Sequence, residues 1–193
     1  MAKEESGFRV IIVLVLIAMC SAVLLAYVNK VTTGPIEINK KAETKKAIGI
    51  VLHGIKDYKF SENPAETQID GSKAKYFKAV NEDSVVLGYA IIVKGPNGFT
   101  NDFDMMVGID SSGTILDTYV LDHKETPGLG DGMTKPLFKE QFSGRTLQNT
   151  KWRVKKDGGD VDAITAATIT SRAFTAGVER ALRIFKTVKE EQE

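Results

Sequence analysis

The chain has 193 residues, which is room for one domain of ordinary size beside an N-terminal anchor. Its 26 Lys and Arg balance 25 Asp and Glu, a net charge of +1, which argues against a nucleic-acid partner. The single cysteine, Cys20, excludes an intramolecular disulfide and a thiolate metal cluster. His53 and His123 lie far apart without companions at ligand spacing, so we expect no metal site.

The uncharged run 10–28 predicts a membrane-spanning helix, because it would extend roughly 28 Å against a hydrocarbon core of about 30 Å. The alternatives are a buried core helix, a cleaved signal peptide after Arg9, or a lipoprotein signal at Cys20. The run lacks a polar stripe and is long for a signal core, and Met19 is a poor residue before a lipidated cysteine. We therefore expect a tail at 1–9, a transmembrane helix at 10–28, a linker and helix at 29–60, and a folded domain at 61–193.

The residues themselves leave the sidedness of the domain open. More lysines follow the apolar run than precede it, which would keep the domain inside the cell, but a long domain can be translocated regardless of such charges.

After the apolar run, Gly34 and Pro35 are expected to mark the exit from the membrane. A helical pattern covers 36–52, and Gly54 is a plausible end. Residues 61–72 are rich in Ser, Asn, Pro, Asp and Gly and are expected to form a loop. Runs of aromatic and β-branched residues predict strands at 75–80, 85–93, 103–109 and 114–121, with turns at 95–98 and 110–113.

The rest of the chain predicts a short helix at 134–142, a short strand at 152–154 and a long last helix. In that helix one apolar stripe is formed by residues at steps of three and four, namely Phe174, Val178, Ala181, Phe185 and Val188. The expected fold class is therefore α+β, a mostly antiparallel sheet with flanking helices, preceded by one transmembrane helix.

Hydroxyl-bearing and small residues gather where the last helix begins, in the stretch 162–171, DAITAATITS. Free backbone N–H groups and the positive end of the helix dipole favour a phosphate there. Ala166 and Ala167 would let a bulky group approach the backbone, and the Asp162 carboxylate could orient a hydroxyl or hold a metal during a modification. The alternative is a plain helix start at which Thr165 or Thr168 is the N-cap.

A second stretch, 123–132 with the sequence HKETPGLGDG, predicts an irregular loop with close backbone approach. Leu129 at its centre could press an apolar side chain on a ring, while exposed N–H groups reach ring carbonyls. The alternative is a plain connection between a strand and a helix.

Together these stretches resemble the two hallmark motifs of the FMN-binding domain family. Its flavin-attachment motif has an Asp, a Ser or Thr three residues later and then Gly-Ala-Thr. Its second motif, Glu-Thr-Pro-Gly-Leu-Gly, matches residues 125–130 without departure. The two stretches lie about 40 residues apart in the family's order, after an anchor helix. The chain departs at Ala166, where the family usually has Gly; if this position needs φ > 0, Ala costs about 1 kcal/mol.

The resemblance implies that a dedicated flavin transferase joins FMN to the chain through a phosphoester on Thr168. It implies further motif partners at Asp162, Thr165, Ala166 and Ala167, and a loop lining the isoalloxazine at Glu125, Thr126, Pro127, Gly128, Leu129 and Gly130.

The family includes the G-type protein of the Rnf electron transport complex and the C-type protein of the sodium-pumping NADH:quinone reductase, and the short chain favours the Rnf type. The implied role is an electron carrier with no catalytic residue of its own, in a membrane complex that couples ferredoxin:NAD⁺ electron transfer to ion translocation. Its implied partners are the other subunits, the transferase and membrane lipid, and its domain would lie on the periplasmic side of the inner membrane. The alternatives are a stand-alone membrane-anchored FMN carrier, a subunit of the sodium-pumping type, and a binding or assembly module without a cofactor.

Overall fold

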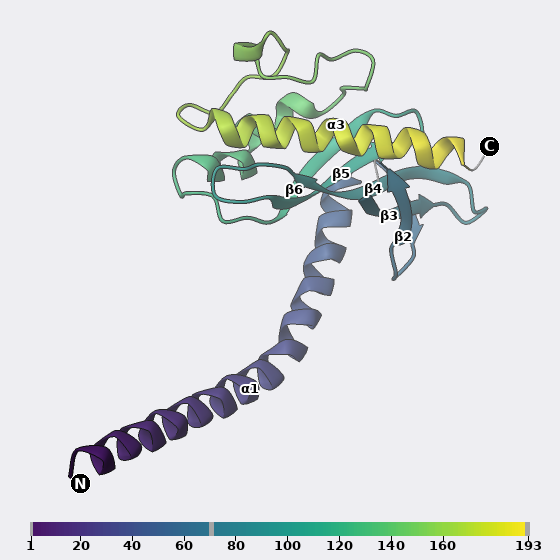
Figure 1. Cartoon of the computed structure of the whole chain (residues 1–193). Helices are drawn as coiled ribbons and strands as arrows, with labels where there is room; N and C mark the ends of the chain where they lie inside the picture. Colours follow the sequence, from purple (N-terminus) through teal and green to yellow (C-terminus); the bar gives the residue numbers. More distant parts are fainter. Residues whose placement is uncertain (1, 70–71, 192–193) are drawn as a thin grey trace. The chain divides into compact units, whose positions relative to one another are not determined.

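The computed structural model describes residues 2–69 and 72–191, and it divides the chain into two compact units, Met1–Glu43 and Thr44–Glu193. The first unit consists of most of α1 (Ala2–Val51), a single long helix. The second unit holds the end of α1, an antiparallel sheet and the remaining helices (Figure 1).

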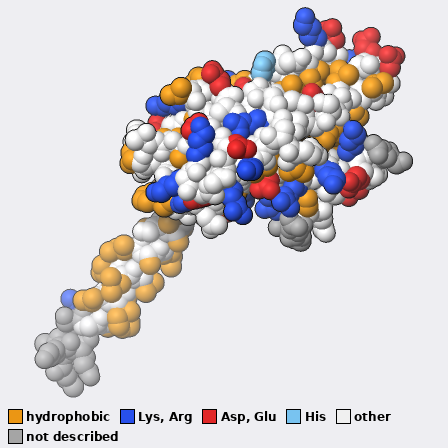
Figure 2. All heavy atoms as spheres, turned by 90° about the horizontal axis from the view of Figure 1, so that it is seen from above, with side chains coloured by type: hydrophobic (Ala, Val, Ile, Leu, Met, Phe, Trp, Pro, Cys, Tyr) orange, Lys and Arg blue, Asp and Glu red, His pale blue; other side chains and the backbone are white. Residues whose placement is uncertain are grey.

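One stretch of α1, Gly7–Val51, is long and apolar enough to cross a membrane, and its large apolar side chains are exposed along the helix (Figure 2). The expected break at Gly34 and Pro35 is wrong, because α1 continues through Pro35. Proline lacks an N–H and so cannot donate the usual hydrogen bond to the carbonyl of Val31. Helix-compatible residues on both sides continue the helix in spite of this loss.

The sheet has six strands, joined in the order β1-β3-β4-β5-β6, with β2 pairing on β3. All of the pairings are antiparallel. The strands expected from the sequence are confirmed, whereas the loop expected at 61–72 is wrong in part because it contains β2. The strands are β1 (Lys59–Phe60), β2 (Ala65–Ile69), β3 (Ser72–Val80), β4 (Val86–Gly95), β5 (Phe103–Asp110) and β6 (Ile115–Asp122).

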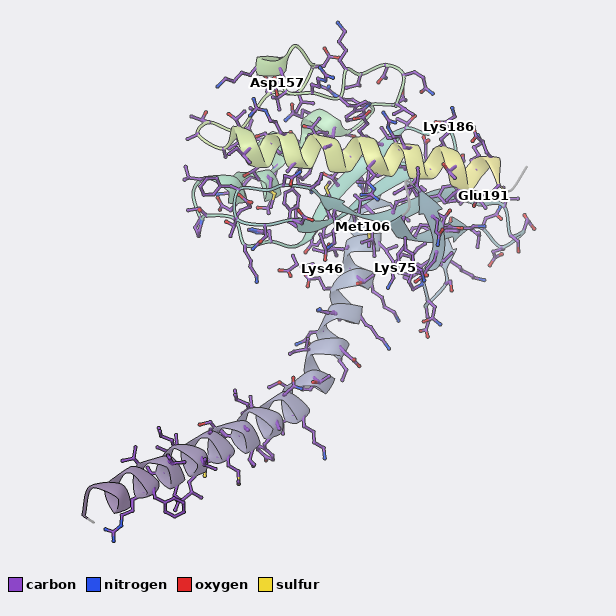
Figure 3. All side chains as sticks on the ribbon, viewed as in Figure 1. Lys46, Lys75, Met106, Asp157, Lys186 and Glu191 are labelled. Atoms are coloured by element: carbon purple, nitrogen blue, oxygen red, sulfur yellow. The ribbon has the colours of Figure 1, made fainter. Side chains whose placement is uncertain are left out.

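The end of α1 packs on one face of this sheet. Ala47, Ile48, Val51 and Leu52 are fully buried and form a cluster with apolar side chains of β3, β4 and β5. One of these is Met106 of β5, which lies on the side of the sheet away from α3 (Figure 3). Any side chain at Gly108 of β5 would overlap the backbone carbonyl of Val51, so glycine is what lets the helix end approach the strand this closely.

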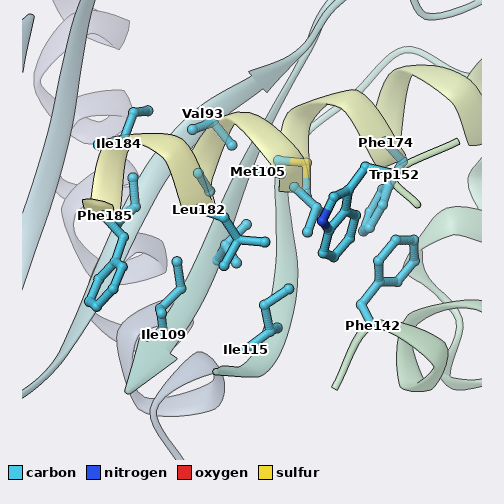
Figure 4. Packing of buried hydrophobic residues seen from close by; sticks show 14 of the residues in the cluster. Val93, Met105, Ile109, Ile115, Phe142, Trp152, Phe174, Leu182, Ile184 and Phe185 are labelled. Carbon is cyan, nitrogen blue, oxygen red and sulfur yellow. The ribbon is translucent and has the colours of Figure 1, made fainter. Parts of the chain in front are cut away.

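The other face is covered by α3 (Thr168–Glu190), which carries the predicted apolar stripe into the larger core. Figure 4 shows Leu182, Ile184 and Phe185 of this helix against Val93, Met105 and Ile109 of the sheet. The chain between β6 and α3 closes one end of that core with aromatic rings, and Phe142 packs against both Trp152 and Phe174. The fold is therefore α+β, as predicted.

The segment between β6 and α3 is mostly irregular. It contains η1 (Gly130–Thr134), α2 (Pro136–Lys139), η2 (Glu140–Phe142) and η3 (Lys155–Asp157). The helix expected at 134–142 is confirmed as α2 followed by η2. The strand expected at 152–154 is wrong, because Val154 makes one isolated parallel bridge with Val161 and no ladder.

Candidate functional site

The loop at residues 125–130 and the start of α3 meet at a shallow depression in the surface. Its volume is about 120 Å³, well below the roughly 300–1,000 Å³ of a site that encloses a drug-sized ligand. A large ligand here would therefore stay partly open to solvent. The lining residues are Phe99, Glu125, Thr126, Leu129, Gly130, Ala166, Ala167, Thr168, Ile169 and Thr170.

Seven of the residues singled out in the sequence line this depression. Four others, Pro127, Gly128, Asp162 and Thr165, do not line it.

Glu125 joins the parts of the site from below. Its side chain is buried, and its Oε2 accepts a hydrogen bond of 2.6 Å from the hydroxyl of Thr170 on α3. Its Oε1 accepts a second bond, of 3.3 Å, from the backbone N–H of Thr100 in the turn after β4. Hydrogen bonds to a buried charged group are stronger than neutral ones, so this carboxylate fixes three segments of the chain against one another.

Two glycines make room for the Glu125 carboxylate. A Cβ at Gly130 would collide with Oε2, and a Cβ at Gly98 would lie 2.8 Å from Oε1. The glycines before β5 and in the second motif are thus required by the close approach of the backbone to a buried side chain.

The loop that follows Glu125 is folded by its own backbone. The carbonyl of Thr126 accepts hydrogen bonds from the N–H groups of Leu129 and Asp131, at 3.1 and 3.4 Å, and Gly128 between them has φ +79°. This turn holds Leu129 at the rim with 43% of its side chain exposed. Leu129 therefore presents an apolar surface that the protein's own core leaves uncovered.

The other side of the depression is the first turn of α3. Thr168 is the first residue of the helix and is half-buried; the N-cap is Ala167, without a side-chain cap. The alternative in which Thr165 or Thr168 serves as N-cap is therefore wrong. The hydroxyl of Ser171 instead accepts from the N–H of Ile164 and donates to the carbonyl of Ala167, both at 2.9 Å. The first N–H groups of α3 are left available for an anion.

Ala166, where the chain departs from the family motif, has φ +60°. This is the left-handed region, in which an L-residue with a Cβ costs about 1–2 kcal/mol. The turn before Thr168 is therefore strained in this chain, and a glycine would relieve the strain.

Asp162 and Thr165 lie on the approach to this turn. The Asp162 carboxylate forms an ion pair of 2.7 Å with Lys155, and both its backbone groups bond to the side chain of Gln141. Thr165 is exposed. The carboxylate is thus turned to the chain segment before α3 and not to the depression.

A second ion pair ties the same segment to α3. The Arg172 guanidinium makes two hydrogen bonds, of 2.6 and 2.7 Å, to the carboxylate of Asp157. Hydrogen bonding to Arg172 lowers the pKa of Asp157 below its ordinary value of 3.8.

Phe99, Ile169 and Thr170 line the depression although neither motif alone singled them out. Phe99 is 67% exposed, which is unusual for a phenylalanine, and it follows a glycine-rich turn; that exposed position was its one signal in the sequence. Thr170 could be recognised once Glu125 was known to be buried, since such a carboxylate needs a nearby donor.

The lining suits a flat aromatic group that carries a phosphate. Phe99, Leu129 and Ile169 offer exposed apolar side chains, each at least 43% exposed, and they surround a helix N-terminus that favours an anion. Within residues 2–69 and 72–191, no group of three His, Cys, Asp or Glu could hold a metal ion. These observations fit FMN.

Comparison with known proteins defines the class. The sequence model of the FMN-binding domain matches residues 98–183, which include the whole lining of the depression. The G-type protein of the ion-translocating oxidoreductase complex of Shewanella baltica (strain OS223) is 33% identical over 197 residues, covering 94% of this chain and 88% of that protein. The chain belongs to this family of G-type complex proteins with an FMN-binding domain.

Other relatives match over a shorter range. The G-type protein of the complex of Salmonella typhi is 44% identical over 112 residues, so the chain spans about half the length of that relative. The crystal structure of NqrC from Shewanella oneidensis has a TM-score of 0.56 and 18% identity, covering 79% of this chain and 99% of that one, which shows a shared fold.

Proposed function

We propose that this chain is the covalently flavinylated electron-carrier subunit of a membrane complex that couples ferredoxin:NAD⁺ electron transfer to ion translocation. Relatives that the chain covers over most of their length are named as the G-type protein of an ion-translocating oxidoreductase complex. This supports the Rnf type over a subunit of the sodium-pumping reductase and over a stand-alone carrier.

The observation that carries the proposal is the position of Thr168. Its half-buried side chain lines the depression, at the first position of a helix without a side-chain cap. A phosphoester on this hydroxyl would place its negative charge beside free N–H groups and the positive end of the helix dipole.

The remaining residues would hold the ring system. Leu129, Phe99 and Ile169 supply apolar contact, and Glu125 keeps the loop and the helix start together through Thr170. FMN supplies the redox chemistry, and the protein's share is to set its position, its environment and its exposure. Because the depression is small, the bound ring would remain accessible to redox partners at its open side.

The chain is membrane-anchored through α1, and we place the domain on the periplasmic side of the inner membrane. On that side free FMN is scarce, and a covalent bond would prevent its loss. A dedicated flavin transferase would install the bond, the other subunits of the complex would exchange electrons with it, and lipid would surround α1. Protease treatment of intact spheroplasts should digest the domain, and a protected domain would contradict this sidedness.

Mass spectrometry of the peptide that contains Thr168 tests the central claim. Protein produced with the transferase and the other subunits should carry the added mass of an FMN phosphoester on this peptide. A peptide of unmodified mass from a fully matured complex would refute covalent attachment. Loss of the other subunits from a purification through a tag on this chain would instead favour a stand-alone carrier.

A further inference from the structure

A larger opening lies away from the depression, between β3 and β4. Its volume is about 370 Å³, and Lys73, Lys75, Lys94 and Arg180 are among its lining residues. Arg180 follows Thr168 by about 18 Å along α3 at 1.5 Å per residue. The opening is therefore separate from the FMN site.

The opening exists because two paired strands diverge. Pairing of β3 with β4 ends at Lys75 and Ile92, although β3 extends back to Ser72 and β4 extends on to Gly95. β4 stays paired with β5 as far as Gly95, and β3 stays paired with β2 as far as Ser72. Two strand edges with main-chain groups facing the gap thus border the opening, which is the arrangement that accepts an added strand.

The charge of the opening is positive. Lys73 pairs with Glu66 at 3.3 Å. Lys75, Lys94 and Arg180 have no ion-pair partner within 4 Å among the residues that the structure describes, and the one carboxylate in the lining is Asp104, opposite Lys94 on β5. The cations sit over an apolar floor that includes Ile92 and Ile184.

We propose that this opening, the β3–β4 groove, docks an extended acidic segment of a partner protein. A strand entering the gap would bond to the two free edges, place acidic side chains beside Lys75 and Lys94, and turn alternate apolar side chains toward Ile184. A free phosphate or a lipid headgroup would use the cations but not the strand edges. The proposal goes beyond the FMN site and does not depend on it.

The test measures binding to the full chain in phosphatidylcholine nanodiscs. The probe is a fluorescein-labelled peptide of alternating glutamate and valine, followed by fluorescence anisotropy. Binding should be saturable, and the double substitution Lys75→Glu with Lys94→Glu should weaken it about tenfold or more. The matched reversal Lys151→Glu with Lys156→Glu changes the net charge equally at exposed positions outside the groove, and it should leave affinity within about twofold.

Two further arms separate the possible ligands. A peptide N-methylated at alternate residues should bind more weakly, because it cannot pair with a strand edge; equal affinity would overturn the proposal. Binding that is lost to inorganic phosphate, or that occurs only with vesicles containing phosphatidylglycerol, would also overturn it. Equal peptide affinity of the groove variant and the wild type would do the same. Thr168→Val should bind the peptide normally, so a failure of the flavin proposal leaves this result unaffected.

Discussion

The loop at residues 125–130 and the approach to α3 at residues 162–168 border the same depression, yet they are held by different kinds of contact. The loop is anchored by a buried carboxylate with two hydrogen bonds and by glycines that fit closely around it. The approach is held by an exposed ion pair, by contacts to Gln141 and by a strained alanine. The rigid half is suited to positioning a ring, and the exposed half is suited to access by a modifying enzyme.

The largest effect that separates the two halves is expected at Thr168. Thr168→Val keeps the branched shape but removes the hydroxyl oxygen, so covalent flavin should be absent. In-gel fluorescence after denaturation, with the transferase present, measures this directly. Thr187→Val, a partly buried threonine of the same helix, is the control and should keep the fluorescent band. A band in Thr168→Val would assign the bond to another residue.

On the rigid half, Thr170→Val should destabilise the fold by roughly 1.5–3 kcal/mol, because it removes a donor from a buried carboxylate. Urea denaturation followed by the fluorescence of Trp152, which is buried in the core, measures the change. The midpoint should fall with an unchanged slope. Thr187→Val should cost less than about 0.5 kcal/mol, and an equal cost in both variants would show that the Glu125 contact contributes little.

On the strained half the expected sign is reversed. Ala166→Gly should raise the free energy of unfolding by about 1 kcal/mol, because glycine adopts φ +60° without a steric penalty. Ala163→Gly, at an exposed position that is not among those with positive φ, is the matched control and should gain nothing. If the two glycine variants are equally stable, no strain is stored at Ala166.

A smaller effect is expected at the rim. Leu129→Ala should leave the flavin attached, since Leu129 is far from any bond-forming role, but should shift the flavin absorption spectrum by removing an apolar contact. Its stability should change little, because 43% of the side chain is exposed. An unchanged spectrum would remove Leu129 from the site.

The smallest effect concerns the ion pair between Asp157 and Arg172. Arg172→Ala should raise the pKa of Asp157 toward its ordinary value of 3.8, which NMR titration of the carboxyl carbon measures. A lowered pKa in the folded state stabilises the protein above the unfolded pKa, and that stability is lost as the pH falls through the folded pKa. The wild type and the variant should therefore differ slightly at neutral pH and converge in strong acid.

The sequence predicted the fold best where a pattern reports directly on burial. The strands that became β3 to β6 and the stripe of α3 are long and periodic, so hydrophobic pattern sufficed. β2 was missed because its five residues are mostly exposed and it is held as a strand by pairing with β3. The residue types of Trp152 and Val154 predicted a strand, whereas both are buried in an irregular segment by contacts with rings elsewhere in the chain.

For the candidate site, residues 125–130 and 166–168 could be placed together from their resemblance to two motifs. The hydrogen bond between Glu125 and Thr170 spans 45 residues and has no local signature, so it required the structure. The left-handed backbone at Ala166 was foreseen as a condition, and the structure meets that condition. The orientation of Asp162 toward Lys155 depends on a loop whose path the sequence did not define.

The contact between Gly108 and Val51 sets where this protein can be shortened. The residues that close the second face of the sheet, Ala47 to Leu52 among them, belong to the last turns of a helix that the apolar run begins. A water-soluble version cut at the end of α1 would uncover that face and invite aggregation. A cut just before Thr44 removes the lipid-soluble part and retains the lid that the sheet requires.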